Sequence, residues 1–284
     1  MDKTILQNLI PAIAKKYNFR SAIIEKDYYL TVVLNSIESD LTQRIVFKGG
    51  TLLNKIYFNY NRLSEDLDFS YYSDEPLSKR SQRSKAIAPI KEKMGKFLNG
   101  IGLKSEEPRG KGFNNSTQYL FNVLYDSIIT GKEESIKIEI SLRQTPIDKP
   151  VYNEIKHFFQ DPFTGKDLLP RNKILSLTLK EAVAEKLKAA ITREDVAIRD
   201  YYDLWYISES KFNFLDRHFI NLLMKKLEYE KYEGDYKSNF GLTENEIKIL
   251  HGQVEKDLLP VVRTDTHFEL NKVFERFNGI LKNI

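Results

Sequence analysis

The sequence contains no cysteine, only four histidines and no long apolar run. Without thiols the chain can form neither disulfides nor thiolate metal sites, and it has no cysteine nucleophile. No apolar run approaches the roughly 18 residues that a membrane-spanning helix needs. The four histidines are scattered, with no spacing typical of metal ligands: His157, His218, His251 and His267. Thiol chemistry and membrane insertion are therefore excluded as the basis of function.

An excess of charge of one sign is also nearly absent. The chain has 44 Lys and Arg against 40 Asp and Glu, which gives a net charge of +4. This mild excess permits a polyanionic partner such as nucleic acid but does not require one. A hydrophobic content of 41% and a charged content of 30% are typical of a soluble globular protein. The N-terminus does not resemble a signal peptide, so we expect a cytoplasmic protein.

With 284 residues, the chain has room for one large domain or two modest ones. Apolar residues at helical spacing predict helices over residues 3–17, 21–38, 51–58 and 77–98. Short apolar or alternating runs predict strands over residues 44–47, 66–72, 119–125 and 136–142.

The character of the sequence changes in its second half. Residues 145–170 are rich in Pro, Asp and Gly, which is typical of a linker. From about residue 172 onward helical periodicity dominates, and no convincing strand pattern is found. We therefore predict an α/β domain with a mixed sheet over residues 1–170, followed by an α-helical bundle domain over residues 171–284.

Two adjacent glycines follow the first predicted strand, in the sequence Lys48-Gly49-Gly50-Thr51. Glycines and a hydroxyl favour a tight turn with exposed backbone N–H groups. Such turns at the start of a helix commonly bind phosphate. We interpret this stretch, the glycine turn, as a candidate phosphate-binding site.

An Asp-x-Asp pair follows in the strand predicted over residues 66–72. Side chains in a strand alternate between its two faces, so Asp66 and Asp68 share one face while Leu67 and Phe69 point into the core. A carboxylate pair close to a phosphate-binding turn indicates metal-assisted phosphoryl transfer on a nucleotide.

Glu139 is the candidate for a third carboxylate, in the strand predicted over residues 136–142. If this strand lies beside the Asp66/Asp68 strand, three carboxylates converge, and two bound Mg²⁺ ions are expected to neutralise them. The alternative is that Glu139 is a solvent-facing residue on a half-exposed sheet, and the residues alone leave both interpretations open.

A second group of charged residues lies in the helical part of the chain. Thr178 and Glu181 have the spacing of a capping box and predict a helix start. Lys186 lies on this helix, and the next helix carries Arg199, Asp200 and Asp203 at spacings of three and four residues. Ordinary surface ion pairing is the simpler interpretation of such spacing.

Four motifs in order resemble one known family: Lys48-Gly49-Gly50-Thr51, Ser64-Glu65-Asp66-Leu67-Asp68-Phe69, Glu185-Lys186-Leu187 and Arg199-Asp200-Tyr201-Tyr202-Asp203-Leu204. This arrangement is similar to the AbiEii/AbiGii toxin family of nucleotidyltransferases, which includes the MenT toxins. The resemblance extends from about residue 26 to residue 207. It implies a core like that of DNA polymerase β nucleotidyltransferases, followed by a helical domain.

The resemblance also implies roles for the matching positions. Asp66 and Asp68 would hold Mg²⁺, Lys186 would contact phosphates or the base, and Asp203 or Asp200 would supply a late acidic residue. Together with Glu139, these are the expected catalytic residues. The residues expected to bind the NTP are Lys48, Gly49, Gly50, Thr51, Ser64, Arg199 and Asp200. Ser64 also matches a position that an antitoxin phosphorylates in some relatives. The turn ends in Thr51 where the wider pattern has serine, so the hydroxyl is preserved.

The function implied is that of a Mg²⁺-dependent toxin in a toxin–antitoxin or phage-defence pair, which transfers a nucleoside monophosphate from an NTP to the 3′ end of a tRNA. A cognate antitoxin protein is the expected partner, and we expect a monomer. The basic helix over residues 77–98 would help to bind RNA phosphates, although a plain solvated helix face is the simpler interpretation.

Three rival functions remain. A metal-dependent nuclease also gathers carboxylates, although it usually has a lysine two residues after the acidic residue, whereas Lys137 precedes Glu139. A small-molecule nucleotidyltransferase of the antibiotic-modifying type would need an acidic acceptor pocket, and a binding module would need no intact carboxylates. The sequence leaves open which NTP and which acceptor are used, which antitoxin binds, and whether Ser64 is phosphorylated.

Overall fold

The computed structural model describes residues 3–41 and 44–284. The chain divides into two compact units, Met1–Leu177 and Thr178–Ile284. All strands of the described residues lie in the first unit, and the regular elements described in the second unit are helical. The predicted fold class, an α/β core with a mixed sheet followed by a helical bundle, is confirmed.

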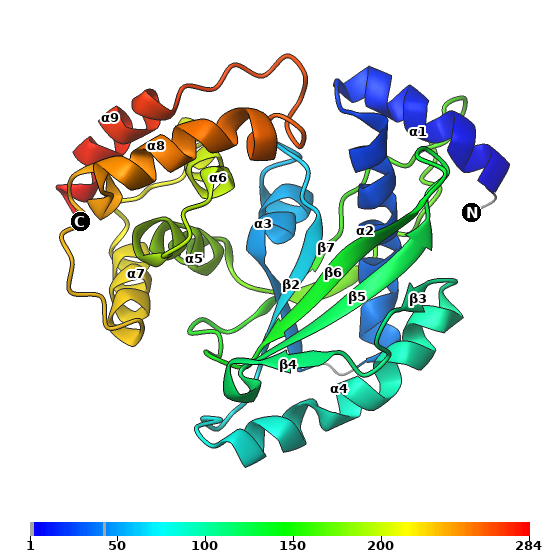
Figure 1. The fold of residues 1–284 in the computed structure, drawn as a ribbon, viewed down its shortest axis with the longest axis horizontal. Helices are drawn as coiled ribbons and strands as arrows, with labels where there is room; N and C mark the ends of the chain where they lie inside the picture. Colours follow the sequence, from blue (N-terminus) through cyan, green and yellow to red (C-terminus); the bar gives the residue numbers. More distant parts are fainter. Residues whose placement is uncertain (1–2, 42–43) are drawn as a thin grey trace. The chain divides into compact units, whose positions relative to one another are not determined.

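The first unit is built on an eight-stranded mixed sheet (Figure 1). The strands are β1 (Ile45–Lys48), β2 (Asp66–Tyr71), β3 (Lys104–Ser105), β4 (Lys111–Phe113), β5 (Gln118–Asp126), β6 (Glu133–Ser141), β7 (Val151–Glu154) and β8 (Lys173–Ser176). They lie in the order β3-β5-β6-β2-β1-β8-β7, and β4 pairs with β5 off this path. The β2–β6 and β1–β8 pairs are parallel, and the other pairs are antiparallel. The strand that carries the Asp-x-Asp pair is therefore central in the sheet.

Alternation along the central strands separates a buried face of the sheet from a polar one. Leu67, Phe69, Ile138 and Phe47 are all fully buried, and the rings of Phe47 and Phe69 lie 5.5 Å apart. The residues between them therefore project from the opposite face of the sheet. This geometry places the acidic residues of β2 and β6 outside the core.

The helices of the first unit are α1 (Lys3–Tyr17), α2 (Ser21–Asp40), α3 (Gly49–Leu52) and α4 (Arg80–Gly100), with a π-helical turn, η1, at Leu53–Tyr57. Helix α2 runs along the sheet and contacts β6 and β8 (Figure 1). The predicted helix over residues 51–58 begins earlier, because the two glycines form the first turn of α3, and it continues as η1.

The prediction that residues 145–170 form a linker is wrong. Strand β7 lies inside this stretch and pairs with β8, which is itself a strand beyond residue 172. Ile155 and Phe159 follow β7 and are fully buried. The many turn-forming residues suggested a linker, although the stretch contains an edge strand and a loop that is anchored in the core by these two apolar residues.

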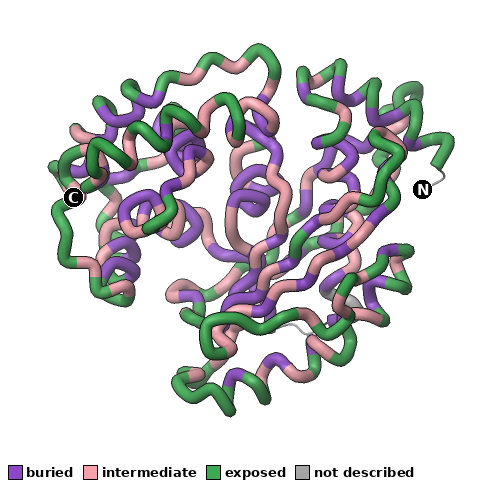
Figure 2. Tube along the Cα trace, viewed as in Figure 1, coloured by how far each residue is buried: buried purple, intermediate pink, exposed green. Residues whose placement is uncertain are grey.

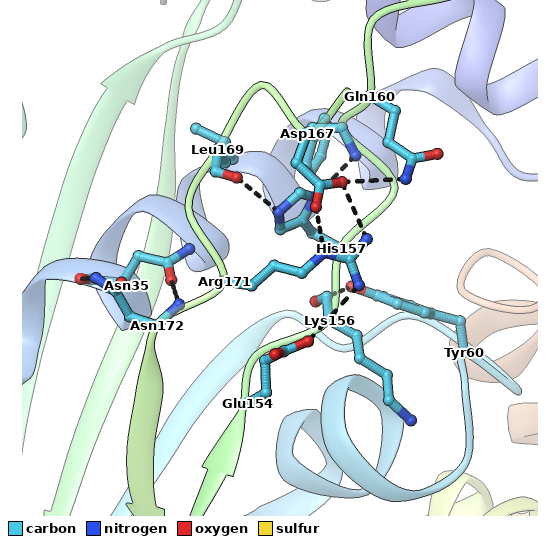
Figure 3. A network of polar contacts seen from close by, with 11 residues as sticks. Asn35, Tyr60, Glu154, Lys156, His157, Gln160, Asp167, Leu169, Arg171 and Asn172 are labelled. Carbon is cyan, nitrogen blue, oxygen red and sulfur yellow. Dashed lines mark hydrogen bonds and ion pairs between the residues drawn. The ribbon is translucent and has the colours of Figure 1, made fainter. Parts of the chain in front are cut away.

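A hydrogen-bond network fixes the loop between β7 and β8 (Figure 3). His157 is buried, with Nε2 3.0 Å from the carbonyl of Leu169 and Nδ1 accepting the N–H of Phe159. Burial is the main reason why the pKa of His157 is lowered from 6.5. Asp167 accepts hydrogen bonds from Arg171 at 2.6 Å and from Gln160 at 3.0 Å. His157 thus has a structural role.

The second unit contains α5 (Leu179–Thr192), α6 (Ile198–Glu209), α7 (Arg217–Tyr229), α8 (Glu244–Gln253) and α9 (Leu270–Leu281), with short helical turns η3 (Asn239–Gly241) and η4 (Val254–Leu258). Helices α5, α6, α7 and α9 each bury several residues, whereas α8 buries Leu250 alone (Figure 2). Thr178 caps α5 by accepting the N–H of Glu181 at 3.3 Å. The carboxylate of Glu181 pairs with the buried Lys226 at 2.9 Å. None of the described helices is long and apolar enough to cross a membrane.

Candidate active site

Asp66 and Asp68 project from the polar face of β2, as the alternation predicted. Both side chains are partly exposed, whereas Leu67 between them is fully buried. β2 lies between β1 and β6, so its carboxylates have a neighbouring strand on each side. Lys48, the last residue of β1, is the register partner of Asp68.

Glu139 lies beside Asp68 on the adjacent parallel strand. The register of β2 and β6 pairs Asp68 with Glu139 and Asp66 with Lys137. Lys48, Asp68 and Glu139 therefore occupy one level across three neighbouring strands and share one face of the sheet. The strand of Glu139 therefore lies beside the Asp-x-Asp strand, as the prediction of a third carboxylate required.

Asp66, Asp68 and Glu139 line a single pocket with a volume of about 370 Å³. Among the described residues, no three acidic or histidine side chains lie close enough to form a ready cage for a metal ion. Mg²⁺ is commonly held by one or two carboxylates, while waters and substrate phosphates complete its shell. The two carboxylates of the Asp-x-Asp pair fit that donor set, and Glu139 lies beside them on the adjacent strand.

The glycine turn lies directly against the carboxylate strand. Gly49 has a φ of +81°, and a Cβ placed on it would come within 2.2 Å of Oδ2 of Asp68. A Cβ on Gly50 would come within 2.6 Å of the guanidinium of Arg62 and 3.4 Å from Oγ of Ser64. Both glycines are therefore explained by close approach of neighbouring side chains.

Thr51 and Ser64 link the turn to β2. Thr51 is 1% exposed, and its hydroxyl donates to the backbone carbonyl of Asp66 at 2.5 Å. The Thr51 hydroxyl thus fixes the start of the carboxylate strand. Ser64 is half-buried two residues before Asp66, close to Gly50 and to the buried Arg62.

The charged residues of the second unit form a cluster of their own. Lys186 lies between Asp200, at 2.7 Å, and Asp203, at 3.0 Å, and Arg193 binds the other oxygen of Asp200 at 2.9 Å. Both aspartates are less than 5% exposed, so these contacts are not ordinary surface ion pairs. Arg199 instead donates to the carbonyl of Asp257 at 2.9 Å. That this cluster completes the carboxylate site remains a prediction.

A family model matches residues 32–276, which is most of the chain; its description is nucleotidyl transferase AbiEii toxin, type IV toxin–antitoxin system. The chain belongs to the AbiEii family. The resemblance found in the four sequence motifs is thereby confirmed, and membership makes the chain a nucleotidyltransferase of a toxin–antitoxin family.

Solved structures of two bacterial proteins share the fold of this AbiEii family member. MenT4, a nucleotidyltransferase toxin from Mycobacterium tuberculosis H37Rv, aligns with a TM-score of 0.59 at 15% identity, over 98% of this chain and 90% of that one. JHP933 from Helicobacter pylori aligns with a TM-score of 0.54 at 16% identity, over 93% of this chain and 92% of that one. At such identities the likeness shows the fold alone. No curated protein matches the chain.

Sequence reasoning missed a buried ion pair next to the glycine turn of this AbiEii family member. Lys55 of η1 lies 2.8 Å from Asp27 of α2, and both side chains are at most 2% exposed. Lys55 also donates to Thr31 at 2.8 Å and Tyr60 at 3.1 Å. Burial raises the pKa of Asp27 and lowers the pKa of Lys55, and their mutual attraction opposes both shifts. In the sequence, the signal of this ion pair was a lysine, Lys55, among the apolar residues of a predicted helix.

The other residues missed are those that complete the carboxylate pocket: Lys137, Phe113, Asn114, Gln118 and Leu120. They come from β4, β5 and β6 and from the turn after β4. Strand register alone brings them beside the Asp-x-Asp pair, and the sequence gives no direct signal of that pairing.

Proposed function

We propose that this AbiEii family member transfers a nucleoside monophosphate from an NTP to the 3′ end of a tRNA. The observation that carries the transfer step is the arrangement on one sheet face, where the Asp66/Asp68 pair lies between the glycine turn and Glu139. The tRNA acceptor is what the family resemblance implies. In this reaction the acceptor hydroxyl oxygen bonds to the α-phosphorus, and the bond from that phosphorus to the leaving pyrophosphate breaks.

In this proposal Asp66, Asp68 and Glu139 supply the oxygen ligands for Mg²⁺. Bound there, Mg²⁺ would supply charge neutralisation for the triphosphate and activation of the acceptor hydroxyl. The alternative role that we propose for Glu139 is that of the base that accepts the proton of the acceptor hydroxyl. Backbone N–H groups at Gly49 and Gly50, with the lysine at position 48, bind the phosphates.

For the second unit, we assign Lys186 the task of neutralising triphosphate charge. Its salt bridges to Asp200 and Asp203 hold the ammonium group in place, and a fixed charge gives more electrostatic stabilisation than a mobile one. Asp203 is then a positioning residue, and Arg199 fixes the start of α6 through its bond to Asp257.

The experiment incubates the purified protein with Mg²⁺, total tRNA and each radiolabelled NTP in turn. Wild type is compared with Asp66→Asn/Asp68→Asn and with Lys186→Gln. We expect label on tRNA with the wild type, none with the double variant, and a higher KM for the NTP with Lys186→Gln. Shortened RNA would instead indicate a nuclease, and label on a small acceptor alone would indicate an antibiotic-type enzyme.

The toxin role requires a cognate antitoxin, which we propose as the protein partner on the basis of the family. Expression of the wild type without that partner is expected to slow growth, and the Asp66→Asn/Asp68→Asn variant is expected not to. Equal growth of the two strains would contradict the toxin role while leaving the transfer reaction untouched.

A further inference from the structure

One wall of the carboxylate pocket consists of an aromatic ring and two amide side chains, contributed by Phe113, Asn114 and Gln118. Phe113 lies directly opposite Gln118 in the β4–β5 pair, so both side chains are on the same face of the sheet. The Phe113 side chain is 44% exposed at the edge of a strongly charged pocket. An aromatic ring so placed adds little to the core, and such rings commonly stack on unpaired nucleobases.

The turn after Phe113 is held in an unusual backbone conformation. Asn114, Asn115 and Ser116 are three consecutive left-handed residues, with φ values of 50°, 54° and 64°. Asparagine adopts this conformation at modest cost, whereas for Ser116 it costs roughly 1–2 kcal/mol, and such strain is concentrated at binding sites. Arg83 of α4 is 8% exposed, and its guanidinium donates to the carbonyl of Asn115 at 2.9 Å. The wall of the pocket is therefore fixed by a buried arginine.

The amide pair can form hydrogen bonds with the edge of a base. Nδ2 of Asn114 donates to Oε1 of Gln118 at 3.0 Å, which uses one N–H of the first amide and one lone pair of the second. Each amide has two donors and two acceptor lone pairs, so the pair still offers both kinds of group. Lys137, also on this side of the pocket, is exposed and provides positive charge for a phosphate.

The position of this wall in the sheet points to the acceptor rather than to the NTP. The glycine turn follows β1 on one side of β2, whereas β6, β5 and β4 lie on its other side. In an in-line displacement the attacking and leaving oxygens lie on opposite sides of the reacting phosphorus. With the triphosphate at the glycine turn, the acceptor approaches the carboxylates from the β4 side.

We propose that Phe113 stacks on the unpaired terminal base of a single-stranded nucleic-acid acceptor, while Asn114 and Gln118 bind the edge of that base. This acceptor-base subsite rests on the proposed transfer reaction, and it identifies the acceptor as an unpaired strand end rather than a protein or a small molecule.

The test measures both binding and turnover for the full chain. Binding of a short single-stranded RNA with 2-aminopurine at its 3′ end is followed without NTP, because stacking quenches the fluorescence of this base. Turnover gives separate KM values for RNA and NTP. The variants are Phe113→Ala, Phe113→Tyr as the conservative replacement, and Phe163→Ala as the control. Phe163 is a 95% exposed phenylalanine of the same unit and is not part of the pocket lining.

Loss of one aromatic–base stack is worth roughly 1–3 kcal/mol, so Phe113→Ala should raise the KM for RNA by about 5- to 150-fold. We expect it also to abolish the quenching, with the KM for the NTP unchanged, while Phe113→Tyr and Phe163→Ala behave like the wild type. An unchanged KM for RNA, or a rise confined to the KM for the NTP, would overturn the subsite.

The two proposals fail in different ways. If the wild type and Phe113→Ala transfer nucleotides with equal efficiency, the subsite is ruled out and the transfer function stands. Quenching that depends on Phe113, without transfer to any RNA, would keep base stacking on Phe113 and remove both the transfer function and the acceptor role of the bound strand. A wild type with neither quenching nor transfer would overturn both.

Discussion

Replacement of Gly49 by alanine is expected to damage the active site much more than the fold. A Cβ at this position would lie 2.2 Å from Oδ2 of Asp68, whereas ordinary contact begins at 3.4 Å. The carboxylate would have to retreat by the difference, 1.2 Å, and the Cβ and Cγ atoms of Asp68, each 2.9 Å away, would have to move with it. The substitution therefore displaces a proposed metal ligand directly.

The size of the effect follows from this displacement. A misplacement of about 1 Å in an active site costs about 100-fold in rate, which corresponds to about 2.7 kcal/mol of transition-state stabilisation. The left-handed backbone, with φ of +81°, adds a separate penalty of roughly 1–2 kcal/mol to the free energy of unfolding when a Cβ is present. Activity and stability must therefore be measured together.

Gly131 provides the matched control for this experiment. It has a φ of +67°, and a Cβ added to it would have no heavy atom within 4 Å, so Gly131→Ala introduces similar backbone strain without the clash. We expect similar losses of stability in urea for the two variants, and a loss of kcat/KM for nucleotide transfer in Gly49→Ala alone. Equal activity of Gly49→Ala and Gly131→Ala would refute the reasoning that Gly49 makes room for Asp68.

Two further predictions concern buried ionisable groups in the first unit. Lys55→Met should lower the free energy of unfolding in urea by about 3–5 kcal/mol, because it leaves the buried carboxylate of Asp27 without its partner. Lys55→Met/Asp27→Leu should recover most of this loss, and an equal loss in both variants would contradict the assignment. The folded state lowers the pKa of His157 below 6.5. The contribution of neutral His157 to the free energy of unfolding should therefore be fully present above pH 6.5 and should be lost as the pH decreases below it. In His157→Gln this pH dependence should flatten between pH 7 and 5; an unchanged slope would show that another group titrates.

The parts of the site that follow from local pattern were predictable from the sequence. Alternation alone assigns Asp66 and Asp68 to one face and Leu67 and Phe69 to the other. Adjacent glycines before a helix indicate a close backbone approach. The adjacency of Glu139 depended on strand order, which no local pattern determines, and it became definite only with the β2–β6 register.

The parts that were missed depend on tertiary packing. Strands β7 and β8 have four residues each, which is too short for periodicity to stand out from a turn-rich background. Lysine is almost never fully buried unless paired, and the partner of Lys55 lies far away in the sequence, at Asp27. Phe113 joins the pocket only through the pairing of β4 with β5.

The most direct test of the account is the mass of the RNA product. After incubation with Mg²⁺, NTP and tRNA, the 3′-terminal fragment of the tRNA should gain the mass of one or more nucleoside monophosphates, with one pyrophosphate released for each. The Asp66→Asn/Asp68→Asn variant should produce neither change. A tRNA fragment of unchanged mass with the wild type and every NTP, or an equal gain with the double variant, would contradict nucleotide transfer to tRNA at this carboxylate site.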